Sequence, residues 1–224
     1  MGYFTNGKVD YTLYFITDTT YASVDEMITR VEAAVRGGAG IVQLREKDRS
    51  TREYIEIAER VHEVTKEAGV PLIIDDRLDV ALAMGAEGVH VGSSDMPVAK
   101  AREIADKVAG RHFIVGATAK TVPAALDAYN HGADYLGCGA IYPTTTHVKT
   151  TITSTDTLRD VCNAVPIPVC AIGGLNKDNL EILRGIPIAG VCVVSAIMKA
   201  PDPYEATIGL IDTVRKLFSG VRVL

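Results

Sequence analysis

The chain has 224 residues, of which 47% are hydrophobic and 23% charged, and its formal net charge is −5. These values are typical of a soluble globular protein. No basic run is present, which excludes nucleic acid as an expected partner because binding to a phosphate backbone needs clustered Lys and Arg. No segment is apolar enough to span a membrane, and the first ten residues lack a secretion signal. We therefore expect one cytoplasmic domain over residues 1–224, with the four cysteines reduced and mostly buried.

Short runs rich in Val and Ile alternate with amphipathic stretches along the chain. In chain order, the predicted strands are residues 13–17, 40–44, 71–75, 88–91, 112–116, 135–139, 169–172 and 190–194. The predicted helices are residues 24–35, 54–64, 99–108, 122–129, 157–165, 179–183 and 207–218. The strands mostly lack an apolar/polar alternation, which is typical of parallel strands covered on both faces. Eight such strands, with helices between most of them, predict a (β/α)8 TIM barrel.

Active sites of this fold form at the carboxyl ends of the strands, so the last residues of each strand are site candidates. At the end of the second strand, Gln43, Arg45 and Lys47 share one face because strand side chains alternate. If that face points inward, an amide and two cations line the barrel mouth. This column suits an anionic ligand better than the alternative, a solvated charge cluster.

Acidic residues follow the third and fourth strands. Asp76 and Asp95 lie at neighbouring strand ends, where they can share a hard cation. Mg²⁺ is typically held by one or two carboxylates, water and substrate phosphates. The alternatives are a salt bridge from Asp76 to Arg77 and a helix cap at Asp95.

A second phosphate region is predicted on the other side of the mouth. Loops after the seventh and eighth strands of barrels often bind phosphate through backbone N–H groups, and these loops hold Gly173-Gly174 and Val194-Ser195. An ordinary tight turn would explain the glycines equally well. The Thr-rich loop from Thr144 to His147 adds hydroxyls, or is a plain surface loop. Two facing phosphate regions favour the joining of two phosphorylated small molecules, with diphosphate leaving on the metal side.

Six segments together resemble the thiamine-phosphate synthase family, in the family's order and over nearly the whole chain. They are QLREK at 43–47, IDDRLDVA at 74–81, GAEGVHVGSSDM at 85–96, GADYLGCGAIYPTTT at 132–146, AIGGL at 171–175 and VVSAI at 193–197. The resemblance implies an enzyme that joins a hydroxymethylpyrimidine diphosphate to a thiazole phosphate, giving thiamine phosphate and pyrophosphate. It also implies Mg²⁺ as the cofactor, with Asp76 and Asp95 as its ligands.

The resemblance assigns roles to the remaining site residues. Arg45, Lys47 and Thr118 are the implied catalytic residues. The implied substrate-binding residues are Gln43, Leu44, Arg45, Glu46, Lys47, Asp75, Thr118, Thr144, Thr145, Thr146, His147, Lys149, Gly174, Val194 and Ser195.

Four positions depart from the family pattern. At one of them Thr118 replaces a serine and keeps the hydroxyl. The family usually has Asn where Asp75 stands, and a carboxylate there repels diphosphate unless it is protonated or recruited to the metal. Thr145 replaces a proline of the family pattern. His147 replaces a lysine, and we expect the nearby Lys149 to take over the role of that lysine. A Lys149→Ala variant with an unchanged KM for the pyrimidine diphosphate would contradict that expectation.

Two other interpretations stay open. A thiazole tautomerase shares the barrel but lacks the magnesium acids and the full cationic strand, and His147 could serve it as a proton shuttle. The other is a barrel that binds thiamine precursors without turnover. The sequence leaves the oligomeric state open between a monomer and a homodimer, and it leaves open whether the thiazole phosphate carries a carboxylate.

Overall fold

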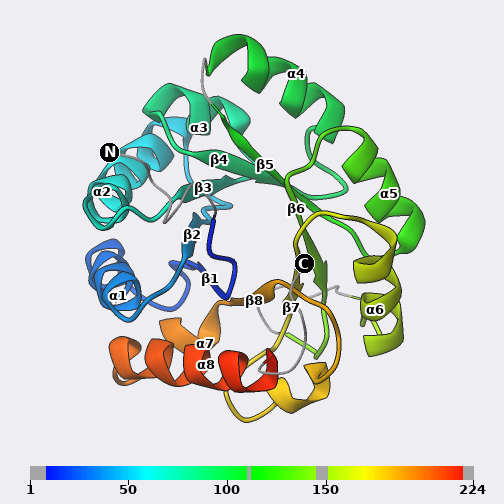
Figure 1. Ribbon diagram of the computed structural model, residues 1–224. Coiled ribbons are helices and arrows are strands. Elements are labelled where there is room, and N and C mark those ends of the chain that lie inside the picture. Colours follow the sequence, from blue (N-terminus) through cyan, green and yellow to red (C-terminus); the bar gives the residue numbers. More distant parts are fainter. Residues whose placement is uncertain (1–8, 110–111, 145–150, 219–224) are drawn as a thin grey trace.

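The computed structural model describes residues 9–109, 112–144 and 151–218. Its eight strands are parallel and pair in chain order, and β8 closes on β1. In Figure 1 the strands form an inner ring and the helices an outer one. The predicted (β/α)8 barrel is therefore confirmed. The strands are β1 (Leu13–Ile16), β2 (Ile41–Leu44), β3 (Leu72–Asp75), β4 (Gly88–Val91), β5 (Ile114–Thr118), β6 (Tyr135–Gly139), β7 (Val169–Ile172) and β8 (Gly190–Val193).

The helices begin and end with clear local signals. Ser23 and Ser50 cap the first two helices, each in a capping box with a glutamate three residues later. Gly69 and Gly85 end two helices in the left-handed conformation, as helix-ending glycines commonly do. The helices are α1 (Val24–Arg36), α2 (Thr51–Ala68), α3 (Leu78–Met84), α4 (Val98–Val108), α5 (Val122–Asn130), α6 (Thr155–Ala164), the 3-10 helix η1 (Leu180–Leu183), α7 (Ser195–Met198) and α8 (Pro203–Phe218).

Several elements differ from the prediction, among them α7, a short helix over Ser195–Met198 that was not predicted. β5 runs over Ile114–Thr118 rather than 112–116, so Thr118 ends the strand instead of following it. α3 was not predicted, because its seven residues are too few for a clear helical period. The segment expected to be a helix at 179–183 is a single turn of 3-10 helix over Leu180–Leu183.

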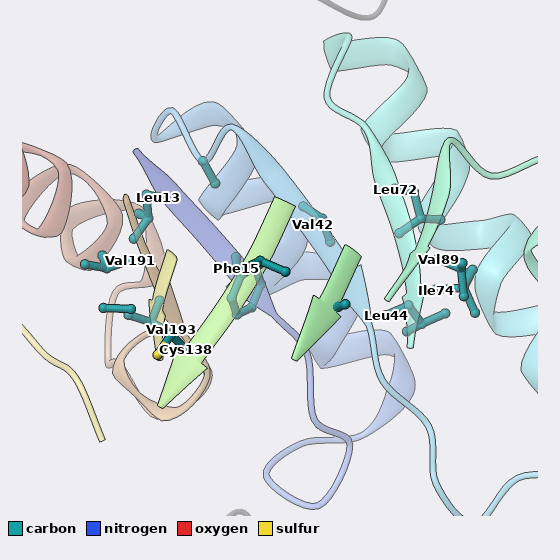
Figure 2. Close-up of a cluster of buried hydrophobic side chains, with 14 of the residues drawn as sticks. Leu13, Phe15, Val42, Leu44, Leu72, Ile74, Val89, Cys138, Val191 and Val193 are labelled. Atoms are coloured by element: carbon teal, nitrogen blue, oxygen red, sulfur yellow. The ribbon is translucent and has the colours of Figure 1, made fainter. Parts of the chain in front are cut away.

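Both faces of the strands are buried, which explains their lack of alternation. One set of strand side chains points outward and packs against the helices; Figure 2 shows members such as Phe15, Leu44 and Ile74. The other set fills the barrel interior. That inner cluster contains Tyr14, Ile16, Ile41, Ile73, Ile114, Tyr135, Cys170 and Cys192.

Glycines make room for the large inner side chains. A Cβ on Gly116 would lie 2.1 Å from Cζ of Tyr135, and one on Gly137 would lie 3.4 Å from Cε1 of His90. Tyr135 is fully buried, so its ring fits only because its strand neighbour has no side chain. The barrel centre thereby holds polar groups beneath its mouth. None of the described helices has the length and apolar character needed to cross a membrane.

Candidate active site

A cavity of about 320 Å³ opens at the carboxyl ends of the strands, and all eight strands contribute to its lining. Barrel enzymes carry their active sites at this end. The lining includes most of the residues predicted from the sequence. These are Gln43, Arg45, Lys47, Asp75, Asp76, Asp95, Thr118, Thr144, Gly174, Val194 and Ser195.

The predicted cationic column points into the cavity, and carboxylates hold it in place. Arg45 Nη1 lies 3.3 Å from Oδ2 of Asp18, and Arg45 Nε lies 3.8 Å from Oδ2 of Asp75. Lys47 Nζ lies 3.0 Å from the same Asp75 oxygen and also pairs with Asp76. Burial opposes the charge of Lys47, but Asp75 and Asp76 outweigh it and raise its pKa, so the ammonium stays charged.

Asp75 sits at the centre of this network. It is 9% exposed, and burial raises its pKa against the opposing effect of Lys47 and Arg45. Asp18 was not singled out from the sequence, although it follows β1 and is 3% exposed. Its Oδ1 accepts hydrogen bonds from the backbone N–H and the hydroxyl of Thr20, which leaves Oδ2 directed to Arg45.

Two further carboxyl groups meet beside Lys47. Asp76 adopts a left-handed backbone conformation with φ of 60°, an uncommon geometry that Asp tolerates better than most residues. Asp95 Oδ2 accepts a hydrogen bond from the backbone N–H of Gly92 at 2.9 Å. Burial and the adjacent Asp76 carboxyl raise the pKa of Asp95. Among the described residues, no cluster of three or more His, Cys, Asp or Glu side chains forms a ready-made metal cage.

The second predicted phosphate region lies across the cavity, where Gly173 and Gly174 follow β7. Both have a positive φ, 105° and 65°. A Cβ on Gly173 would lie 2.4 Å from Cβ of Ala140, and one on Gly174 would lie 2.7 Å from Cβ of Tyr142. Glycine is therefore required at both positions, because the backbone has a positive φ and because the loop after β6 leaves no space for a Cβ. Both glycines and Ser195 line the cavity.

The floor of the cavity is a row of hydrogen bonds across the barrel. Gln43 Nε2 donates to the Tyr14 hydroxyl at 2.8 Å, and the hydroxyls of Tyr14 and Tyr135 are 2.7 Å apart. His90 Nδ1 lies 2.9 Å from the Tyr135 hydroxyl, and His90 Nε2 lies 3.0 Å from Oγ1 of Thr118. Burial lowers the pKa of His90 to about 4, so its ring is neutral near pH 7.

Two of the predicted site residues, Leu44 and Glu46, do not line the cavity. Leu44 is fully buried in the outer core, and Glu46 points to the opposite side of its chain segment, as strand alternation requires. Glu46 Oε2 accepts from the Thr19 hydroxyl at 2.9 Å and pairs with Arg49 at 3.5 Å, while its Oε1 is buried without a hydrogen bond among the described residues. The predictions for Thr145, Thr146, His147 and Lys149 fall outside the described residues.

Among the residues that line the cavity without having been predicted, four carry polar groups of interest: Tyr14, His90, Lys120 and Tyr135. Three of them lie within strands and were hidden among apolar neighbours. Lys120 follows β5, and its ammonium forms no salt bridge within the part of the chain that the structure describes. Lys120 could have been predicted as a charged residue just beyond the end of a strand.

Comparisons with known proteins agree with this geometry. The family model described as thiamine monophosphate synthase matches residues 13–197. Thiamine-phosphate synthase 2 of Streptococcus pneumoniae is 47% identical over 92% of this chain and 97% of that protein, and thiamine-phosphate synthase of Enterococcus faecalis is 45% identical over 92% and 95%. A solved thiamine phosphate pyrophosphorylase from Pyrococcus furiosus aligns with a TM-score of 0.83 and 37% identity over 94% of this chain and 98% of that one. The chain belongs to the thiamine monophosphate synthase family.

Proposed function

We propose that this chain, as a member of the thiamine monophosphate synthase family, joins 4-amino-2-methyl-5-(diphosphooxymethyl)pyrimidine to a thiazole phosphate. The products are thiamine phosphate and pyrophosphate. The observation that carries the proposal is one cavity lined by charged residues on one side and by the loops after β7 and β8 on the other, within a chain whose relatives are named thiamine-phosphate synthase.

The reaction balances without an oxidant or reductant. The bond between the pyrimidine methylene carbon and the diphosphate oxygen breaks, and its electron pair leaves with the diphosphate. The thiazole nitrogen then gives its lone pair to the methylene carbon and becomes the positively charged thiazolium nitrogen. The task of the chain is to hold two substrates in line and to stabilise the leaving diphosphate, which are positional and electrostatic effects.

The charged side of the cavity fits the diphosphate. Arg45 and Lys47 supply two cations. Their side chains are already positioned at the cavity mouth, because both lie beside the Asp75 carboxylate. We propose that these two side chains bind the diphosphate before and after the bond breaks. Gln43 and Thr118, on opposite sides of the floor, then face the pyrimidine ring.

We also propose that Asp76 and Asp95 bind Mg²⁺. The charged side chains that line the cavity comprise three cations (Arg45, Lys47 and Lys120) and three carboxyl groups (Asp75, Asp76 and Asp95), so a diphosphate would enter a region without a positive excess unless a cation is added. Burial raises the pKa of Asp95, and the neighbouring Asp76 carboxyl raises it further, in keeping with this crowding of negative charge. Two carboxylates with water and phosphate oxygens are the set that Mg²⁺ prefers. Bound there, the ion neutralises charge that develops on the leaving group.

The thiazole phosphate is assigned to the opposite side. Thr144 offers a hydroxyl there, and Gly174, Val194 and Ser195 offer backbone groups at the loops where barrels often hold phosphate. We further propose that residues 1–224 form one domain and that the protein works in the cytoplasm, where its four free thiols would remain reduced.

One assay tests the function. The purified protein is given both substrates with Mg²⁺, and pyrophosphate and thiamine phosphate are measured together. Equal amounts of both products are expected, and none is expected when either substrate is left out. Isomerisation of a thiazole carboxylate without pyrophosphate would support the tautomerase instead. Binding of the substrates with neither reaction would support a non-catalytic barrel.

A further inference from the structure

The row of hydrogen bonds on the cavity floor connects two ligand-facing groups. Its ends are Gln43 on β2 and Thr118 on β5, and its middle members are Tyr14, Tyr135 and His90. Both tyrosines are fully buried, and burial raises the pKa of each, so their hydroxyls keep their protons. Each hydroxyl therefore has one hydrogen to donate, and each must place it on a neighbour or leave it unsatisfied in the interior.

The direction of hydrogen-bond donation along the row follows from the amide group of Gln43 at one end. Gln43 directs Nε2, which can only donate, at the Tyr14 oxygen. Within the described chain, the Tyr14 hydroxyl has one other partner, so its hydrogen goes to the Tyr135 oxygen. The Tyr135 hydrogen then goes to Nδ1 of His90. A neutral ring that accepts at Nδ1 carries its proton on Nε2 and donates it to Thr118.

This direction leaves a defined pattern for a ligand. With its Nε2 facing Tyr14, Gln43 keeps Oε1 as an acceptor. Thr118 accepts from His90, so its own hydroxyl hydrogen remains to be donated. No other hydrogen bond to the Thr118 hydroxyl or to the Gln43 amide occurs among residues 9–109, 112–144 and 151–218. The cavity thus presents an acceptor at one side of its floor and a donor at the other.

The rings cannot easily rearrange to change this pattern. The Tyr135 ring lies 5.7 Å from that of Tyr14, 5.5 Å from that of His90 and 5.4 Å from that of Tyr11, measured between ring centroids. Gly116 contacts its other side closely enough to exclude any side chain. A relay packed this tightly keeps one order of partners, and a reversed relay would need the Gln43 amide to turn over.

We propose that Tyr14, Tyr135 and His90 are positioning residues that fix Gln43 as an acceptor and Thr118 as a donor, and that this polarity selects an amino-substituted pyrimidine over an oxo-substituted one. The inference rests on the proposed function. An aminopyrimidine offers amino hydrogens to an acceptor and ring nitrogens to a donor. The oxo analogue places an acceptor where the amino group stood, which would leave two acceptors facing each other.

Nuclear magnetic resonance tests the polarity without any turnover. The protein is labelled with ¹⁵N-histidine and measured near pH 7.5, where His90 is neutral, and its signals are assigned by their loss in His90→Asn. The expected tautomer has the proton on Nε2, and Tyr135→Phe, which removes the donor to Nδ1, should shift the Nδ1 signal. A proton on Nδ1 in the unmodified protein would overturn the inference.

Selectivity is the second readout. For the unmodified protein, kcat/KM is compared between the 4-amino substrate and its 4-oxo analogue, and we expect a preference of at least ~100-fold because a mismatched buried polar pair is costly. Tyr135→Phe should reduce this ratio by roughly tenfold, the value of one hydrogen bond. Tyr11→Phe is the matched control, since its ring also packs on Tyr135 but its hydroxyl lies outside the relay.

The outcomes separate the two proposals. An equal amino-to-oxo ratio in Tyr135→Phe and in the unmodified protein overturns the relay, even if both enzymes are active. If the unmodified protein releases no pyrophosphate from either pyrimidine, the proposed function fails and the claim of selectivity with it. The tautomer of His90 still tests the hydrogen-bond polarity in that case.

Discussion

The substitution Gly116→Ala tests how tightly the floor of the cavity is built. An added Cβ would lie 2.1 Å from Cζ, 2.3 Å from Cε1 and 2.3 Å from the hydroxyl oxygen of Tyr135. Ordinary carbon contacts are ~3.5 Å or longer, so the ring would have to move by more than 1 Å. Three aromatic rings surround it on its other sides, which leaves no space for that movement.

The expected cost can be taken from overpacked cores. Extra methyl groups in a well-packed interior typically destabilise by about 1–3 kcal/mol, and sometimes more. Because both the backbone of β5 and the Tyr135 ring are fixed, we expect the upper end, about 3 kcal/mol. Displacement of the Tyr135 hydroxyl also breaks its hydrogen bonds to Tyr14 and His90, so kcat/KM should fall together with stability.

Urea unfolding measures the loss, with an unchanged m value as evidence that the unfolding reaction is the same. Gly209→Ala in α8 is the matched control, because a Cβ there meets nothing within 4 Å. It should stabilise the protein by about 0.5–1 kcal/mol, the ordinary gain of Ala over Gly in a helix. A loss below ~1 kcal/mol for Gly116→Ala would refute the reasoning, since overpacking would then be absorbed elsewhere. In the double variant Gly116→Ala/Tyr135→Leu, the two changes should be less than additive.

Three further predictions concern charged residues. Asp76→Asn and Asp95→Asn should each lower Mg²⁺-dependent turnover by at least ~100-fold without loss of stability, because each removes a metal ligand and a like-charge neighbour; full activity in EDTA would contradict this. Burial raises the pKa of Glu46, so its contribution to stability is present below the pKa of the unfolded chain and is lost as the pH rises through the folded value. Glu46→Gln should therefore flatten the fall in unfolding free energy from pH 4 to 8, and an unchanged slope would count against it. Lys120→Ala should raise KM for a phosphorylated substrate several-fold at constant stability, measured by initial rates, if its ammonium faces substrate.

The barrel could be predicted because each unit carries its own signal. Val- and Ile-rich runs mark the strands, and amphipathic stretches mark most of the helices between them. The errors arise where the signal weakens. β5 continues through Gly116 and Ala117, which have small side chains and little strand preference, yet its pairing with β6 extends to Thr118.

The rim of the site was predictable and its floor was not. Residues just beyond a strand, such as Lys47 and Asp76, stand out as charges beside apolar runs. Tyr14 and Tyr135 lie within strands buried on both faces, where hydropathy does not distinguish the inner face from the outer one. The clue to the floor lies in the strand pairing. Gly116 of β5 pairs with Tyr135 of β6, so the missing side chain of the glycine leaves space in the barrel interior for the large tyrosine ring.

Asp75 shows why charge must be judged from contacts rather than from a motif. By sequence, a carboxylate at this point opposes the binding of diphosphate. In the structure it lies 3.0 Å from Nζ of Lys47 and 3.8 Å from Nε of Arg45, so it offsets cations that would otherwise repel each other across the mouth. An amide at the same place could accept a hydrogen bond from Lys47 but could not offset its charge. A carboxyl group here therefore orders the cationic side before substrate arrives, and the repulsion that it adds makes a further cation beside Asp76 and Asp95 more necessary.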